Sequence, residues 1–324
     1  MIIGTVREIW RYPVKSMGGE KMDTCITTAS GLAADRGWAL RDEETGEIRG
    51  GKKWPGLMQC RAEYVETGGT DADLRSDDAR HGGRAPQIPH VLISFPDGSS
   101  IRSDDAQVNA CLSEYLGARV SVWPLQPAND KAHYRRRQPG AAVVGVMGKS
   151  KTFRRVLQAI APYTPLNAQL RGEFSREANE PIPDLSELPG ELFEFATPPG
   201  TYFDAFPIHV LTTASLEAMK KANPGAAWDV RRFRPNFLIE TSAELEGLVE
   251  SEWAGRSVRI GEVLVACTIP TVRCGMTMHA QRDLPKDPSI LRSIVREAEQ
   301  NFGMYAKVEG GGIVRIGDSV KLLA

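Results

Sequence analysis

The sequence predicts a mainly β protein with some helix, of the α+β class. The chain has 324 residues and includes 31 glycines and 21 prolines, which favours many short strands joined by turns over long helices. Short runs of β-branched and aromatic residues occur at both ends of the chain, bounded by glycine, proline and aspartate. Short strands leave exposed edges, and closing them into a barrel would remove those edges.

The first third of the chain alternates strands with polar turns. The strand at the start is rich in isoleucine and tryptophan and is broken by Tyr12-Pro13, and the helix at 104–116 has Val108, Leu112 and Leu116 on one face. In chain order we expect a strand at 3–10, a turn and strand at 31–40, a hairpin tip at 42–47, a surface loop at 68–89, a strand at 91–95 and a helix at 104–116.

The middle of the chain differs from both ends, and the last third returns to clear patterns. Between 124 and 199 prolines are frequent, and 181–192 has the composition of a linker or lid. Two later helices have recognisable starts, one at Thr212 or Thr213 and one at Asp287-Pro288. We expect strands at 208–211 and 237–239, a hairpin at 258–267, and a final hairpin formed by 313–316 and 320–323.

Composition excludes several function classes. Hydrophobic residues make up 41% and charged residues 25% of the chain, which is typical of a globular protein. Because 40 basic residues balance 41 acidic ones, a dedicated nucleic-acid binder is not expected, and Arg135-Arg136-Arg137 is interpreted as a solvated loop. Neither an export signal nor a membrane span is predicted, so a cytoplasmic protein without a membrane partner is the default expectation.

The five cysteines are scattered and include no Cys-x-x-Cys pair, so neither a disulfide framework nor a cysteine zinc ribbon is predicted. The most informative of them is Cys274. Arg273 beside it would favour the thiolate, and Gly275 would let a ligand approach the backbone closely. The residues alone leave two interpretations open: a ligand for a soft metal such as copper, zinc or molybdenum, or a buried and inert thiol.

Several cationic motifs could bind an anion. Lys15-Ser16 follows a strand break and combines an ammonium with a hydroxyl, while Arg36 and Arg234 carry guanidiniums suited to two-point phosphate binding. Taken singly, each of these is more often a structural or solvated pair.

Taken in order, the motifs resemble a known family. They are Tyr12-Pro13-Val14-Lys15-Ser16, Gly31-Leu32-Ala33-Ala34-Asp35-Arg36-Gly37-Trp38, Arg232-Phe233-Arg234-Pro235-Asn236, Arg273-Cys274, Leu284-Pro285-Lys286-Asp287-Pro288 and Gly317-Asp318-Ser319-Val320. The chain resembles a MOSC protein (molybdenum cofactor sulfurase C-terminal type) with the N-terminal β-barrel domain that often accompanies it. The resemblance implies a MOSC-associated β domain at 1–120, a proline-rich insertion or linker at 121–199 and a MOSC domain with a β-barrel at 200–324.

The resemblance also implies a molybdenum cofactor, Mo-molybdopterin. Cys274 would be both the catalytic residue and the protein thiolate on molybdenum. The residues that would hold or frame the cofactor are Lys15, Ser16, Arg36, Thr212, Thr213, Ser215, Arg234 and Arg273. Thr212, Thr213 and Ser215 resemble the family's strand-to-helix turn beside the cofactor, and the amide groups of that helix start would suit an anion.

MOSC enzymes of the mitochondrial amidoxime reducing component type reduce N-hydroxylated compounds. The resemblance therefore implies a reductase of N-hydroxylated or N-oxide substrates, supplied with electrons by a separate reductase or ferredoxin. Two alternatives remain: a sulfur carrier that uses a Cys274 persulfide, and a non-enzymatic protein that binds and delivers the cofactor. These alternatives need the same cysteine or the same pocket, so the sequence does not separate them.

Overall fold

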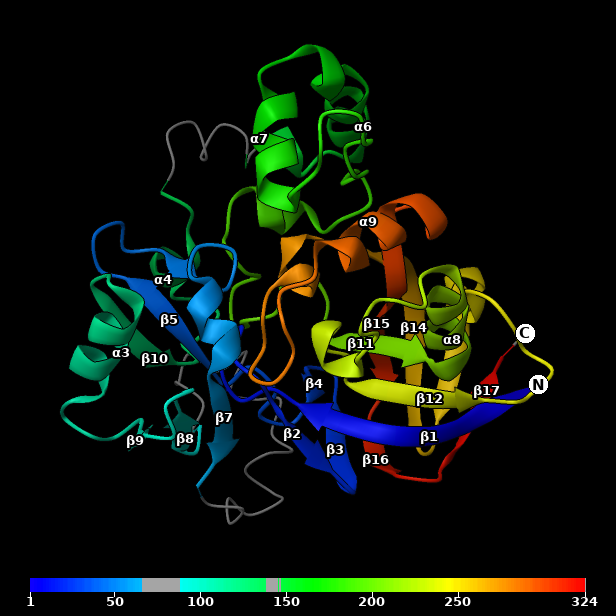
Figure 1. Cartoon of the computed structure of the whole chain (residues 1–324), viewed down its shortest axis with the longest axis horizontal. Coiled ribbons are helices and arrows are strands. Elements are labelled where there is room, and N and C mark those ends of the chain that lie inside the picture. Colours follow the sequence, from blue (N-terminus) through cyan, green and yellow to red (C-terminus); the bar gives the residue numbers. More distant parts are fainter. Residues whose placement is uncertain (66–87, 138–144, 146, 324) are drawn as a thin grey trace.

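A closed barrel of seven strands forms one side of the molecule (Figure 1). The computed structural model describes residues 1–65, 88–137, 145 and 147–323, and most of the loop expected at 68–89 lies outside them. The barrel strands, in order around the ring, are β1 (Ile2–Arg11), β17 (Ser319–Leu322), β13 (Ser257–Ile260), β14 (Val263–Val272), β15 (Asn301–Gly310), β11 (Ile208–Thr212) and β12 (Phe237–Thr241). The ring closes because β12 also pairs with β1, which confirms the predicted β-rich fold with a barrel.

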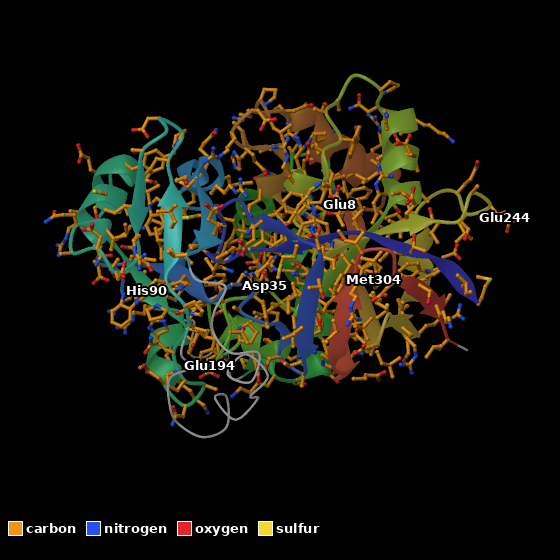
Figure 2. All side chains as sticks on the ribbon, turned by 90° about the horizontal axis from the view of Figure 1, so that it is seen from below. Glu8, Asp35, His90, Glu194, Glu244 and Met304 are labelled. Carbon is orange, nitrogen blue, oxygen red and sulfur yellow. The ribbon has the colours of Figure 1, made fainter. Side chains whose placement is uncertain are left out.

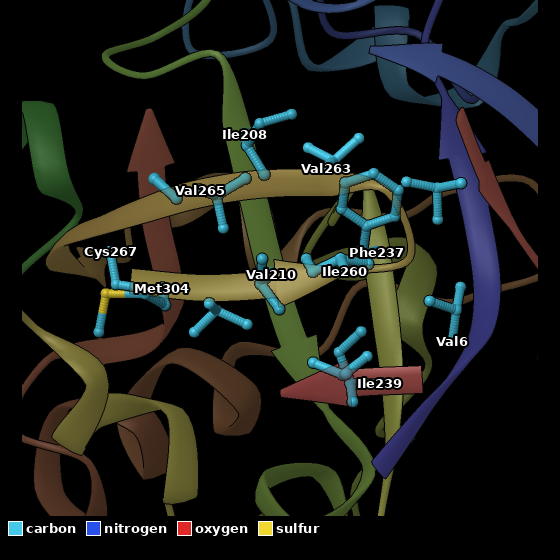
Figure 3. Close-up of a cluster of buried hydrophobic side chains, with 14 of the residues drawn as sticks. Val6, Ile208, Val210, Phe237, Ile239, Ile260, Val263, Val265, Cys267 and Met304 are labelled. Carbon is cyan, nitrogen blue, oxygen red and sulfur yellow. The ribbon is translucent and has the colours of Figure 1, made fainter. Parts of the chain in front are cut away.

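Apolar side chains from the strands fill the barrel (Figure 3). Val6, Val210, Ile239, Val265 and Met304 are all at most 1% exposed, and they come from five different strands. This packing explains the β-branched runs of the sequence, because such side chains fit the pleated surface of a sheet.

The first and last strands of the chain lie side by side in this ring. Thr5 of β1 stands opposite Ser319 of β17, and the amino group of Met1 donates to the carbonyl oxygen of Leu322 at 2.9 Å. The predicted final hairpin is therefore wrong in its pairing. The strand β16 (Gly312–Arg315) pairs with β3 (Thr24–Thr28), not with β17, because the turn at Gly317 carries the chain from one sheet into another.

A second, smaller unit is built from the first third of the chain. One of its sheets contains β10 (Val120–Pro124), β5 (Trp38–Asp42) and β6 (Ile48–Arg49), and the other contains β7 (Arg61–Tyr64), β8 (Val91–Ser94) and β9 (Ser100–Arg102). The short helix η1 (Pro55–Gln59) follows β6. β2 (Glu20–Met22) pairs with β1 of the barrel, and β4 (Gly31–Leu32) pairs with β3. The helix α3 (Val108–Leu116) covers the two sheets and packs through Leu112. It begins four residues later than predicted, because Asp105 accepts the amide of Gln107 in a turn.

The proline-rich middle contains helices that composition did not predict. Its elements are α4 (Lys131–Tyr134), α6 (Lys151–Ile160), η2 (Ala161–Tyr163), α7 (Leu166–Phe174) and η3 (Gly190–Phe193). Ser150 caps α6 by accepting the amide of Phe153, and Pro165 precedes α7, so the turn-forming residues start helices here. We call residues 147–199 the inserted segment; α6 and α7 form the top of the molecule in Figure 1, above α9 (Pro288–Glu297).

Short helices join the barrel strands. They are α8 (Thr213–Ala222), η4 (Val230–Arg232), η5 (Val249–Trp253), η6 (Gly275–Met278) and α9. The two predicted caps are confirmed: Thr212 accepts the amide of Ser215, and Asp287 accepts the amide of Ser289. Within the described ranges, none of the helices combines the length and the apolar character that crossing a membrane requires.

Candidate functional site

Cys274 lies at the end of β14, where the barrel strand gives way to η6. Its carbonyl oxygen accepts the amide of Thr277 at 3.2 Å and the hydroxyl of Thr277 at 3.1 Å, which fixes the backbone of the turn. The thiol residue is half-buried. By contrast, burial raises the pKa of the Cys25 and Cys267 thiols to about 12. Cys274 therefore combines access with a rigid backbone, as a metal ligand requires.

Two buried arginines hold the turn before Cys274. Arg273 donates to the carbonyl oxygen of Phe233 at 3.0 Å, and its own carbonyl oxygen accepts from Arg176 at 2.8 Å. Burial lowers the pKa of Arg273, and it lowers the pKa of Arg176 to about 10. The Nε of Arg273 is buried and has no hydrogen-bond partner among the described residues. An unpaired donor of this kind suits an anion or a polar group of a ligand.

Two further arginines stand over one tyrosine ring. The guanidinium of Arg36 lies 4.7 Å from the centre of the Tyr12 ring, and that of Arg234 lies 4.2 Å from it. We call Tyr12, Arg36 and Arg234 the arginine cradle. Burial, and then the charge of Arg36, lowers the pKa of Arg234 to about 10. The cradle therefore concentrates positive charge at a place where it is costly without an anion.

The buried carboxylate of Asp35 holds the residues of the arginine cradle in place. Asp35 pairs with Arg36, accepts the amide of Tyr12 at 2.8 Å and accepts from Asn236 at 3.0 Å. In Figure 2, Asp35 lies between the unit that carries His90 and the barrel strand that carries Met304. It thus joins the start of the chain to the loop that carries Arg234.

The backbone of the site is strained at three predicted residues. Ser16, Arg36 and Arg234 have positive φ angles of 70°, 50° and 55°, although none of them is a glycine. Such left-handed conformations cost about 1–3 kcal/mol each and persist where the surroundings enforce them. Their gathering at one place indicates a functional site, since strain of this kind clusters at binding and active sites.

Lys15 and Ser16 lie beside the cradle, as the motif predicts. The ammonium of Lys15 donates to Asp204 at 2.5 Å and to the carbonyl oxygen of Tyr202 at 3.0 Å, and its side chain is 12% exposed. Burial lowers the pKa of Lys15, while Asp204 opposes that effect. The hydroxyl of Ser16 accepts the amide of Gly51 at 2.8 Å.

Besides Arg176, four residues that surround this site were not predicted from the sequence. Tyr305 and His209 face each other across β15 and β11 with ring centres 5.6 Å apart, and Asp204 pairs with Lys15. Burial, and then Arg273, holds the pKa of His209 well below its usual range, so this imidazole is neutral at pH 7. Lys52 is the fourth; its only signal in the sequence is the Gly50-Gly51 pair before it.

The hydroxyl groups of Thr212, Thr213 and Ser215 all have partners within the protein. Thr212 and Ser215 each donate to one oxygen of the buried Glu250 at 2.5 Å, and Thr213 contacts Thr241. Thr212 is also three residues along an extended strand from His209, a separation of about 10 Å. Burial raises the pKa of Glu250, so these hydroxyls have an acidic partner of their own. Their binding to a cofactor remains a prediction.

The charge balance tests whether the site fits a molybdenum cofactor. Arg36, Lys15 and Lys52 each have a carboxylate partner, in Asp35, Asp204 and Glu173. Among the described residues, the buried Arg273 and the arginine cradle's Arg234 form no ion pair with a carboxylate and donate to carbonyl oxygens instead. The donor set thus has an excess of positive charge next to a soft thiol, which fits a phosphate-bearing cofactor with a soft metal.

A metal at Cys274 would need further ligands. Across residues 1–65, 88–137 and 147–323, no three His, Cys, Asp or Glu side chains gather closely enough to hold an ion on their own. The dithiolene sulfurs of molybdopterin are ligands of the type that a soft metal prefers.

Comparison with known proteins gives two family matches. Residues 198–321 match the model of the MOSC domain, and residues 3–118 match that of the MOSC N-terminal beta barrel domain. Most of the inserted segment falls between the two matches. A curated relative, mitochondrial amidoxime reducing component 2 of Bos taurus, is 24% identical over 98% of this chain and 83% of its own length.

Solved structures add weaker similarities. The YUAD protein from Bacillus subtilis aligns over 98% of this chain and 94% of its own at 10% identity, with a TM-score of 0.39. YiiM from Geobacillus stearothermophilus aligns over 37% of this chain and 55% of its own at 20% identity, with a TM-score of 0.28. TM-scores this low do not establish a shared fold.

Proposed function

Since this chain carries a MOSC domain preceded by a MOSC N-terminal β-barrel domain, we propose that it binds a molybdenum cofactor and reduces N-oxygenated compounds. The overall reaction converts an N–OH group, two electrons and two protons into an N–H group and water. The name of the bovine relative, an amidoxime reducing component, supports this reaction type over other molybdenum chemistry.

The observation that carries the proposal is the half-buried thiol of Cys274 next to an excess of buried guanidinium groups. Cys274 would coordinate molybdenum and tune it, and would not act as a nucleophile. Arg36, Arg234 and Lys15 would bind the phosphate and pterin, with Ser16 as a further hydrogen-bonding group. When bound, the cofactor supplies two-electron oxygen-atom transfer, and the protein supplies orientation and electrostatics.

The neighbouring titratable groups keep fixed protonation states in this proposal. Burial raises the pKa of the Tyr305 hydroxyl above its usual range, and burial lowers that of His209. Near pH 7 the tyrosine is therefore protonated and the histidine neutral. Neither adds charge beside Cys274, so the cations of the site act on the cofactor without competition from these two side chains.

The electrons would come from a separate protein, a reductase or a ferredoxin. The five cysteines are scattered and include no Cys-x-x-Cys pair of the kind found in many iron–sulfur binding runs. A small-molecule donor can replace this partner in the laboratory, so the reaction can be tested without identifying it.

The test is expression in a host that makes molybdopterin, followed by measurement of molybdenum, pterin and reduction of N-hydroxybenzamidine. We expect Cys274→Ala to lose reductase activity and most of its molybdenum, and Arg234→Ala to lose pterin. Cys267→Ala is the matched control, because this thiol is buried in the barrel core. If Cys274→Ala and Arg234→Ala both keep full molybdenum and full activity, the proposed site is wrong.

The same preparation separates the two alternatives. Mass spectrometry that finds a labile extra sulfur on Cys274 and no molybdenum would favour the sulfur carrier. Transfer of intact cofactor to an apo-enzyme, without turnover of the hydroxylated amidine, would favour the delivery protein.

A further inference from the structure

We propose that the ammonium group of Lys52 binds the oxygen of the substrate's N–O group beside Cys274, held in place by Glu173 and Phe174 of the inserted segment. The inference rests on the proposed function and adds a substrate-binding residue to it. It also gives the inserted segment a role, because Glu173 and Phe174 lie outside both family matches.

The loop that carries Lys52 packs against the turn that carries Cys274. The amide of Gly51 donates to Ser16 at 2.8 Å, and a Cβ atom built on Gly51 would lie 3.0 Å from the Cε atom of Met276, two residues after the thiol. A Cβ on Gly50 would meet the Ser16 hydroxyl at 2.4 Å. The two glycines therefore allow this loop to approach the site more closely than other residues could.

The inserted segment fixes the side chain of Lys52. Its ammonium lies 3.3 Å from a carboxylate oxygen of Glu173 and 4.6 Å from the centre of the Phe174 ring. The same stretch is tied to the Cys274 turn, because Arg176 donates to the carbonyl oxygen of Arg273 at 2.8 Å. Ser175 lies against Gly275, where a Cβ would approach its hydroxyl to 2.2 Å. The segment thus brings Lys52 and Cys274 together.

Lys52 differs from the other cations of the site in its larger exposed fraction and in its unused hydrogen-bond donors. Its side chain is 44% exposed, against 12% for Lys15 and 15% for Arg36. In the described part of the chain, Glu173 is the only hydrogen-bond acceptor of its ammonium, which has three N–H groups. Lys52 is therefore accessible from solvent and has N–H groups free to bind a substrate, whereas Lys15 already donates to two acceptors.

The electrostatics agree with this geometry. Partial burial works to lower the pKa of Lys52, but the neighbouring Cys274, Glu173 and Asp204 outweigh it and raise that pKa. Lys52 is therefore an ammonium throughout the neutral pH range. The oxygen of the substrate gains negative charge as its bond to nitrogen breaks. A hydrogen-bond donor held near that oxygen stabilises the transition state.

The experiment uses the cofactor-loaded protein, reduced benzyl viologen as electron donor and N-hydroxybenzamidine as substrate. We expect Lys52→Met to lower kcat/KM by about tenfold or more, the effect of losing one hydrogen bond to a charged group, with molybdenum content unchanged. Lys52→Arg should recover part of this loss. The matched control is Lys53→Met, because this adjacent lysine has a similar exposed fraction of 42% but pairs with Asp42.

Glu173→Gln tests the positioning role. It should lower kcat/KM less than Lys52→Met and should add nothing when combined with it, since both changes act through one interaction. Unchanged kcat/KM in Lys52→Met overturns the proposal, and so does loss of molybdenum in that variant, which would make Lys52 a cofactor residue.

A binding measurement separates this proposal from the proposed function. Calorimetric titration of the oxidised, loaded protein with N-hydroxybenzamidine should show about tenfold weaker binding for Lys52→Met. If the loaded wild type binds the compound but never reduces it, the proposed function is wrong, and the difference in affinity between wild type and Lys52→Met still tests the role of Lys52. Equal affinity of the two proteins for the compound contradicts that role.

Discussion

Two polar clusters lie at opposite ends of β11, and they differ in how their charges are balanced. At one end, near His209, the arginine cradle and Arg273 present buried guanidiniums, left-handed backbone and an unpartnered donor. At the other end, Thr212 and Ser215 both donate to Glu250 at 2.5 Å. Hydroxyls at a helix start and arginines in a loop both suggest an anion site in a sequence. The charge balance distinguishes them: Glu250 accepts from both hydroxyls of its cluster. Asp35 pairs with Arg36, and among the described residues Arg234 and Arg273 have no carboxylate partner.

The largest expected effect comes from removing the carboxylate under the arginine cradle. Asp35→Ala leaves Arg36 without its partner and the amide of Tyr12 without its acceptor. Breaking a buried pair of this kind should lower the free energy of unfolding by about 3–5 kcal/mol in urea denaturation. Asp104→Ala, which removes a surface pair with Arg102, should leave that free energy almost unchanged. A similar result for both variants would mean that the cradle does not need its buried anion.

The second prediction compares two arginines in neighbouring positions. Arg234→Met should weaken retention of pterin by about tenfold or more, measured as pterin released on gel filtration. Arg231→Met is the control, because Arg231 already pairs with Asp229 at 2.7 Å and with Asp283 at 2.8 Å. Equal retention by both variants would show that the guanidinium excess of the cradle is structural.

A smaller effect is expected where the inserted segment meets the cysteine turn. Gly275→Ala places a Cβ 2.2 Å from the Ser175 hydroxyl and should cost about 1–3 kcal/mol of unfolding free energy. Ser175 has a positive φ angle of 55°, so Ser175→Gly removes both the hydroxyl and the strain. The double variant should recover most of the loss. Without recovery, the contact between these two residues is not the cause.

The smallest prediction concerns the pH dependence of stability at Glu250. Because burial raises its pKa in the folded state, Glu250 contributes stability below its unfolded pKa and loses that contribution as pH rises through the folded value. Glu250→Gln removes this loss, so the variant should gain stability relative to wild type between pH 4 and pH 8. Chemical denaturation across that range measures it. For the control Glu217→Gln, at an exposed position, the free energy of unfolding should change with pH as it does in wild type.

Local patterns in the sequence predicted local structure well. Thr212 and Asp287 were identified as helix caps from residue type alone, and both accept the expected amides. The partner of β16 was not predictable in the same way, because pairing with β3 joins residues almost 290 positions apart and leaves no local signal. The helices of the inserted segment were missed because prolines and clustered charge suggested a linker.

The same distinction holds for the site. The motifs identified Lys15, Arg36, Arg234 and Cys274, and the structure gathers them around one place. The hydroxyls of the α8 start were assigned to that place by resemblance, while Glu250 had no sequence signal among the acids around it. Lys52 was missed because its importance depends on Glu173 and Phe174, which approach it only after the middle of the chain has folded.

The neighbouring positions of β1 and β17 have a consequence for how the protein is made. β1 is synthesised well before its partners β12 and β17: Thr5 stands opposite Glu240 and Ser319, which are 235 and 314 positions later in the chain (240 − 5 and 319 − 5). Until β12 and then β17 are synthesised, the parts of β1 that they cover lack these partners, and unpaired strand edges promote aggregation. The barrel can close completely only after β17 has left the ribosome. Co-expression of a chaperone, or growth at a lower temperature, should therefore raise the yield of folded protein.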